Sequence, residues 1–146
     1  MALNEVTVQD IRVYMRDMVG RNDLLHRLEF KDSEIEAAAR IAVDMFNAIP
    51  PLTMVSGVPL SARFVILAGT AATLLTSEAM AQVRNQLNYS DNGLHVGVDD
   101  KMAMYQQLAG EQRALFDSYA RDIKIAMNAE AAFGGAHSGY ITLPFL

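Results

Sequence analysis

The chain of 146 residues contains no cysteine. Disulfide bonds, thiolate metal sites and cysteine nucleophiles are therefore excluded together. This absence fits a reducing compartment, or a particle that is assembled inside a cell. The N-terminus lacks a basic segment followed by an apolar run, so we expect no signal peptide. The alanine- and leucine-rich uncharged run 64–77 has 14 residues, whereas a bilayer-spanning helix needs about 20, so we expect no membrane contact.

The sequence also lacks an excess of basic residues. Seventeen acidic residues against twelve Lys and Arg give a net charge of −5. Binding to nucleic acid requires basic groups gathered on one face to neutralise phosphates. Here the basic residues are interleaved with acids, so we expect no sequence-specific nucleic-acid binding. The length and the 51% hydrophobic content indicate a single globular domain over 1–146.

Four helices are predicted from capping signals and apolar periodicity. Thr7 and Asp10 signal the start of the first helix, which Gly20 can end. The capping box Ser33–Glu36 predicts a second helix over 33–48, with an apolar stripe. Its stripe residues are Ile35, Ala38, Ala39, Ala42, Met45 and Phe46. The third helix follows Pro59, and the fourth begins at Asp99 or Asp100 and runs to about Ala131.

The third helix is apolar on nearly every face in its first half. A helix of this kind is buried on every face, so it should lie at the centre of a bundle. Another copy of the chain could also cover part of its surface. The fourth helix is predicted from apolar residues that recur at helical spacing. These residues are Tyr105, Leu108, Leu115, Tyr119, Ile123 and Met127. The nine methionines are expected mainly to fill the core.

A polar segment, 84–101, separates these last two helices. Asp91-Asn92-Gly93 is a strong hairpin turn, and the alternating residues after it suit a return strand. The spacing from Asn88 to Asp99 also resembles a calcium loop. Its ligands are poor, since asparagine stands where an EF-hand has its first aspartate and aspartate stands where the bidentate glutamate belongs. The sequence therefore favours a hairpin.

The C-terminal segment "GYITLPFL" is unusually apolar for a chain end. Termini fray unless something holds them. We expect this tail to be buried, against its own bundle or against another chain. The predicted fold is thus mainly α: a bundle of about four helices, with a β-hairpin between the third and fourth helices and an extended C-terminal tail.

No catalytic or cofactor motif is found. His26, His95 and His137 are far apart and form no ligand-spaced pair, and the glycines form no phosphate loop. Glu34, Glu36, Asp99 and Asp100 suit the first turns of helices. We expect neither an enzyme nor a bound cofactor or metal. A small helical enzyme or regulator remains the alternative, and it would need the histidines to converge with carboxylates in a pocket.

The order of the segments resembles small virion proteins of tailed bacteriophages. The resemblance lies in "KDSEIEAAARIAVDMFNAIPP", the long alanine-rich helix, "RNQLNYSDNGLHVGVDDK" and "YQQLAGEQRALFDSYARDIKIAMN". It covers roughly 30–146, and it is closest to head-to-tail connector, or neck, proteins. It implies a ring of identical subunits that joins the portal to the tail and lets DNA pass. Another virion role, as tail terminator or capsid-associated protein, is the alternative within this class.

The same resemblance implies the location and the contacts. The protein would be part of the virion, assembled in the host cytoplasm, with itself and other neck, portal or tail proteins as partners. The hairpin and the tail would carry the subunit contacts. The interface candidates are Asn88, Tyr89, Asp91, Asn92, Gly93, Leu94, His95, Val96, Tyr140, Ile141, Leu143, Phe145 and Leu146.

Overall fold

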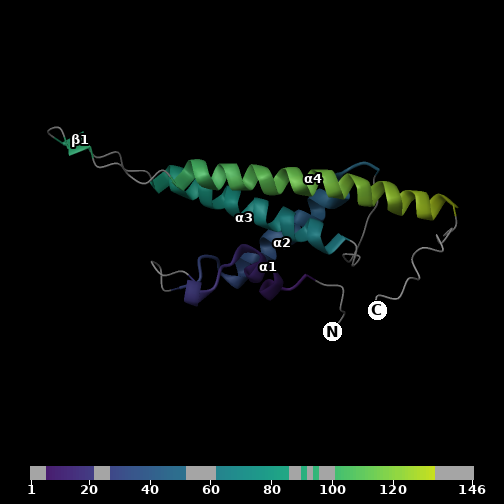
Figure 1. Cartoon of the computed structure of the whole chain (residues 1–146), viewed down its shortest axis with the longest axis horizontal. Helices are drawn as coiled ribbons and strands as arrows, with labels where there is room; N and C mark the ends of the chain where they lie inside the picture. The colour runs from purple at the N-terminus through teal and green to yellow at the C-terminus, as the bar shows by residue number, and fades with distance from the viewer. Residues whose placement is uncertain are drawn as a thin grey trace, which may run out of the picture.

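Four α-helices dominate the computed structural model of the chain (Figure 1). The structure describes residues 6–21, 27–51, 62–85, 90–91, 94–95 and 101–133. The helices are α1 (Val8–Met15), α2 (Asp32–Ala48), α3 (Arg63–Asn85) and α4 (Lys101–Phe133), with a short 3-10 helix, η1 (Val19–Arg21), after α1. The prediction of a mainly helical chain is confirmed.

Helix α3 forms the centre of this arrangement. It packs most extensively against α4, then against α2 and α1, and the first of these pairs lies side by side in Figure 1. Side chains on every side of its first half are buried, among them Ile66, Ala68 and Thr70. The prediction of an enclosed central helix is confirmed. By length and composition Arg63–Arg84 could cross a membrane, but the core helix of a bundle meets the same test.

Two apolar clusters form the core. The larger joins α2, α3 and α4 around Phe46 and Phe116. The smaller joins α1, α2 and α3 around Ile11, Ile35 and Leu74. The predicted stripe of α2 is confirmed, since Ile35, Ala38, Ala42 and Phe46 are buried. The predicted core role of methionine holds in part: no described methionine is fully buried, but Met45 and Met127 pack against the larger cluster and Met15 against the smaller one.

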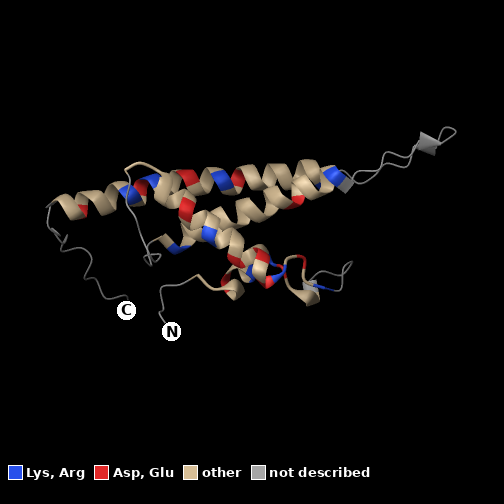
Figure 2. Cartoon of the chain, turned by 180° about the vertical axis from the view of Figure 1, so that it is seen from behind, with Lys and Arg blue, Asp and Glu red and all other residues tan. Residues whose placement is uncertain are grey.

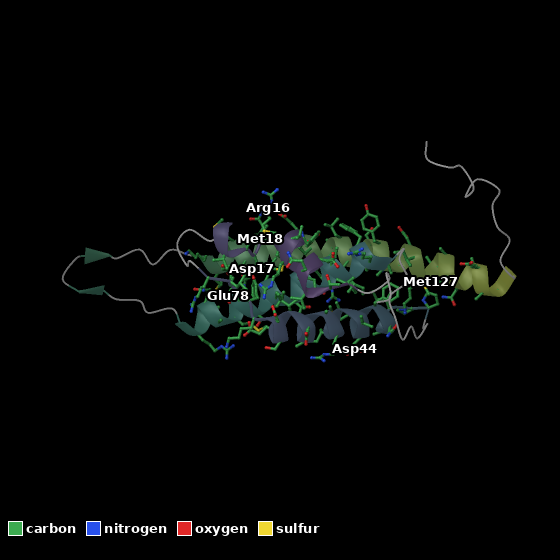
Figure 3. The ribbon with its side chains drawn as sticks, turned by 90° about the horizontal axis from the view of Figure 1, so that it is seen from below. Arg16, Asp17, Met18, Asp44, Glu78 and Met127 are labelled. Carbon is green, nitrogen blue, oxygen red and sulfur yellow. The ribbon has the colours of Figure 1, made fainter. Side chains whose placement is uncertain are left out.

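The start of α1 was predicted correctly and its end was not. Thr7 and Asp10 form the expected capping box: the Asp10 amide donates to Thr7 Oγ1 at 3.2 Å, and the Thr7 amide donates to Asp10 Oδ2 at 2.9 Å. The helix ends at Arg16, which adopts a left-handed conformation with φ of 58°, and not at Gly20. In Figure 3 the side chain of Arg16 points away from the bundle while that of Asp17 points toward it. The contacts of Asp17 inside the fold, described below, explain the early end.

Helix α2 begins slightly before the predicted capping box. Its N-cap is Lys31, and the Lys31 amide donates to the Glu34 carboxylate at 2.8 Å. Glu34 thus has a structural role at the helix start, as its first-turn position predicted. A lysine side chain has no atom that can accept a hydrogen bond, so Lys31 cannot cap the Glu34 amide. Of the two bonds of a capping box, only the one from the Lys31 amide to Glu34 is made.

Helix α4 is the longest element, with 33 residues. Its buried line consists of Ala109, Phe116, Ala120 and Lys124. The helix extends beyond α3 at its C-terminal end, where Met127 lies (Figures 1 and 3). The predicted fourth helix is confirmed, with bounds close to those expected.

The described residues between α3 and α4 form one short ladder. Strands β1 (Ser90–Asp91) and β2 (Leu94–His95) pair antiparallel, with Ser90 opposite His95 and Asp91 opposite Leu94. Residues 86–89, 92–93 and 96–100 lie outside the described residues. Two pairs do not support a hairpin of the predicted extent, over 88–98, so that element stays a prediction.

Candidate functional site

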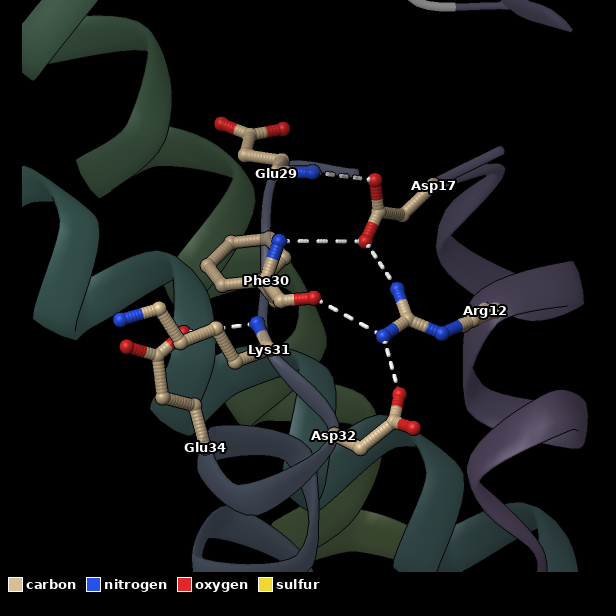
Figure 4. Close-up of polar contacts among 7 residues, drawn as sticks. All are labelled: Arg12, Asp17, Glu29, Phe30, Lys31, Asp32 and Glu34. Atoms are coloured by element: carbon tan, nitrogen blue, oxygen red, sulfur yellow. Dashed lines mark hydrogen bonds and ion pairs between the residues drawn. The ribbon is translucent and has the colours of Figure 1, made fainter. Parts of the chain in front are cut away.

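A buried ionic cluster joins α1 to the segment that leads into α2 (Figure 4). The guanidinium of Arg12 donates to Asp17 Oδ2 at 2.6 Å, to the Phe30 carbonyl at 2.9 Å and to Asp32 Oδ1 at 2.5 Å. The Asp17 carboxylate also accepts from the amides of Glu29 at 2.8 Å and Phe30 at 3.2 Å. Arg12 and Asp17 are both buried.

The geometry of this cluster is that of a structural clamp. Its charges are opposite and paired, and backbone groups occupy further bonding positions of Arg12 and Asp17. In the described part of the chain, no buried side-chain nitrogen or oxygen lacks a hydrogen-bond partner. A buried pair that is completed in this way fixes the position of a chain segment. We therefore assign the cluster to holding α1 and the 29–32 segment together.

A second buried basic group contacts the other end of α2. Lys124 of α4 is fully buried, and its ammonium donates to the carbonyl of Asn47 at 3.0 Å. It also lies 5.0 Å from the centre of the Phe46 ring. A cation near the last carbonyls of a helix interacts favourably with the helix dipole. Burial lowers the pKa of Lys124, since desolvation disfavours the charged form.

Two tyrosines link the N-terminal segment to α4. Tyr14 of α1 donates its hydroxyl to Gln112 Oε1 at 2.6 Å, and Tyr105 of α4 donates to Glu29 Oε1 at 2.7 Å. Burial raises the pKa of both tyrosines, and the Glu29 carboxylate raises that of Tyr105 further. These two bonds join Tyr14 of α1 and the segment before α2 to one flank of α4.

The most conspicuous surface feature is an uncovered apolar line on that flank, which we name the α4 stripe. It consists of Met104, Leu108, Leu115 and Tyr119, which are 66%, 44%, 37% and 49% exposed. Phe64 of α3 borders it, with its ring 5.5 Å from that of Tyr119 in an edge-to-face contact. The line consists of two apolar pairs, Met104–Leu108 and Leu115–Tyr119, with the polar Glu111 and Gln112 between them. Exposed apolar surface that is bordered by polar residues is typical of an interaction site.

A second apolar surface is hollowed between α2, α3 and α4. Two adjoining hollows, of about 480 and 310 Å³, share Thr76, Met80 and Arg113. We name them together the α2–α4 groove. Small residues line it at Ala72, Ala79, Ala109 and Gly110, and the exposed side chains of Ile41, Met80 and Val83 border it. The Arg113 side chain donates to Asp117 at 3.1 Å within the same helix.

The two surfaces lie on opposite sides of the buried line of α4. At 100° per residue, Leu108 and Leu115 fall on one side of Phe116, whereas Gly110 and Arg113 fall on the other. Charges of both signs are spread along the helices and stand close together on α4 (Figure 2). The apolar surfaces are therefore bordered by mixed charge, not by a field of one sign.

Most residues that the sequence singled out lie outside the described part of the chain. This applies to Asn88, Tyr89, Asn92, Gly93, Val96 and all five tail residues, and also to His26 and His137. Asp91, Leu94 and His95 belong to the two short strands, and their side chains are not described. The roles of all these residues stay predictions.

Among the described residues, no group of three or more His, Asp or Glu side chains could hold a metal ion. Comparison with protein-family models, with curated proteins and with solved structures finds no match to this chain.

The sequence contained a signal for the α4 stripe that its periodicity alone did not resolve. Helix α4 has two adjacent apolar lines, Ala109–Phe116–Ala120 and Leu108–Leu115–Tyr119. A single bundle can bury only one of them completely. The two alanines of the first line, and Gly69 of α3 opposite Phe116, allow α3 to approach closely, and the second line is left outside.

Proposed function

We propose that this chain is a non-enzymatic structural subunit that assembles with copies of itself. The observation that carries the proposal is the pair of apolar surfaces on opposite sides of α4. A subunit that meets its neighbour through two different surfaces forms a head-to-tail contact, and such contacts close into rings when the rotation allows it. The α4 stripe with Phe64 supplies one such surface, and the α2–α4 groove supplies the other.

We further propose that this ring belongs to the head-to-tail connector of a tailed-phage particle, between the portal and the tail. The support for this step is the resemblance of 30–146 to neck proteins. The acidic net charge suits a ring through which DNA must pass without being retained. The predicted hairpin over 88–98 and the tail over 136–146 would add contacts to adjacent subunits or rings.

Electron microscopy of the purified protein, and of particles that contain it, tests both steps. The expected images are rings with a central opening in the purified sample and a ring between portal and tail in the particles. Rings that occur elsewhere in the particle would overturn the neck assignment alone. Single subunits in both samples would overturn the proposal as a whole.

A further inference from the structure

The α4 stripe has a symmetry that the proposed ring does not require. Together with Lys101 and Asp122 beyond its ends and Glu111 and Gln112 at its middle, it occupies positions 101, 104, 108, 111, 112, 115, 119 and 122. The successive steps are 3, 4, 3, 1, 3, 4 and 3, which read the same from either end. Steps of three and four keep residues on one side of a helix. The midpoint lies between Glu111 and Gln112.

We propose that two copies of this chain pair antiparallel through the α4 stripe, about a two-fold axis at this midpoint. A two-fold contact uses the same surface on both subunits and must be self-complementary. Leu108 then faces Leu115 of the partner subunit, and Met104 faces Tyr119 of the partner subunit. Thioether sulfur packs favourably against aromatic rings. Each exposed apolar side chain of the stripe thus acquires an apolar neighbour.

The charges along the stripe select the antiparallel orientation. Antiparallel pairing places Lys101 opposite Asp122 of the partner subunit, twice in each dimer. Parallel pairing in register would instead place Lys101 and Asp122 each against its own copy, whereas Glu111 lies near its own copy in both orientations and does not distinguish them. Like charges that face each other disfavour a pairing, and opposite charges favour it. The paired stripes would extend over 22 residues, about 33 Å of helix.

This dimer goes beyond the proposed function and stands independently of it. A ring whose subunits are related by one rotation axis contains no two-fold contact of this kind. Because the same stripe is one surface of the proposed ring contact, the antiparallel dimer describes the free protein and has to open before a ring can form. A protein that forms the dimer but no ring would support this inference and contradict the proposed ring.

The absence of cysteine allows a direct test by disulfide cross-linking. We would prepare Leu108→Cys and Leu115→Cys in the full chain, give one of them a tag, and oxidise each variant alone and the two mixed. In the antiparallel dimer the two copies of position 108 are offset by seven residues, about 10 Å along the helix. A disulfide needs Cα atoms about 4.4–6.8 Å apart. Efficient cross-linking is therefore expected only in the mixture.

A pair of charge variants provides a second test that needs no cross-link. Leu108 belongs to the stripe and Ile125 of the same helix does not, and their side chains are similarly exposed, at 44% and 55%. Leu108→Glu is therefore the test variant and Ile125→Glu its matched control. We expect Leu108→Glu to weaken dimerisation by about 100-fold or more, since each dimer would bury two unpaired charges. Ile125→Glu should leave it unchanged. Equal helical circular dichroism of both variants would show that the fold is intact.

Three results would overturn the inference. The first is cross-linking of Leu108→Cys with itself as efficient as in the mixture, which would indicate parallel pairing. The second is the absence of any cross-link in the mixture. The third is equal dimerisation of Leu108→Glu and Ile125→Glu.

Discussion

Arg12 connects the end of α1 to the beginning of α2 through three acceptors. Replacing it with alanine would leave the buried Asp17 carboxylate without its cation. The loss of one partner from a buried ion pair destabilises a protein by about 3–5 kcal/mol. We expect Arg12→Ala to lower the free energy of unfolding in urea by an amount near that range.

Arg113→Ala is the matched control for this prediction. Arg113 also pairs with an aspartate, Asp117, but the pair is half-exposed and spans one helical turn. Its contacts with Met45 Sδ and the Phe116 ring are likewise made from an exposed position. Pairs of this kind contribute roughly 0.3–0.5 kcal/mol. If the two variants lost similar stability, the clamp would not have the structural role that its geometry indicates.

The buried ammonium of Lys124 should make stability depend on alkaline pH. Above about pH 10.4 this lysine is neutral in the folded and the unfolded chain, so its burial adds no ionisation cost. As the pH falls, the unfolded chain binds the proton first, because burial lowers the pKa in the folded chain. Stability is therefore lost from about pH 10.4 down to the lowered pKa and is constant below it.

Lys124→Met isolates this contribution because it keeps the length of the side chain and removes the charge. The free energy of unfolding of the wild type minus that of Lys124→Met should decrease as the pH falls from about 10.4, and level off. Chemical denaturation between pH 8 and 10.5 would measure it. A difference that did not change over this interval would mean that Lys124 is not desolvated as the structure indicates.

Two glycines inside helices differ sharply in their surroundings. A Cβ added at Gly69 of α3 would lie 2.6 Å from Phe116 Cδ2 and 3.1 Å from Ala42 Cβ, whereas one at Gly110 of α4 would meet nothing within 4 Å. Overpacking a core costs about 1–3 kcal/mol, and replacing glycine by alanine inside a helix gains about 1 kcal/mol.

We therefore expect opposite signs from the two substitutions. Gly69→Ala should lower the thermal midpoint, because the buried Phe116 ring has to shift. Gly110→Ala should raise it, because only the gain in helix propensity remains. Calorimetry of both variants would decide the matter, and a stabilised Gly69→Ala would show that α3 and α4 are packed less closely than described.

At the scale of elements, capping residues in the sequence predicted where helices start. They did not predict where α1 ends, and the apolar pattern did not show which face of α4 is buried. The Thr7–Asp10 capping box is confirmed because it depends on residues three apart in the sequence. The end of α1 at Arg16 was missed because it depends on contacts from Asp17 to amides 12 and 13 residues away. The choice between the two apolar lines of α4 was missed because it depends on which line fits against α3.

At the scale of the whole molecule, the predicted role of the C-terminal tail can be tested by deletion of residues 138–146. If the tail joins subunits, the truncated monomer should keep the thermal midpoint of the full chain while assemblies fail to form. Burying a large apolar side chain contributes about 1.5–3 kcal/mol, so several such residues could hold a joint. A truncated monomer that melts earlier would place the tail in its own core.

The site prediction from the sequence was thus partial. It placed subunit contacts in 88–96, because of the turn residues there, and in 140–146, because of the apolar side chains at the chain end. Both assignments stay predictions. It did not identify the α4 stripe, because an amphipathic pattern shows that a face is apolar without showing whether the same chain covers it. That distinction requires the packing of α3 against α4.

Self-association is the central claim, and sedimentation equilibrium over a range of protein concentrations tests it most directly. The chain has a mass of 16.0 kDa. The account predicts masses that rise with concentration to a multiple of this value, and a shift toward 16.0 kDa for Leu108→Glu but not for Ile125→Glu. A mass of 16.0 kDa at every concentration, the same for the wild type and both variants, would contradict it.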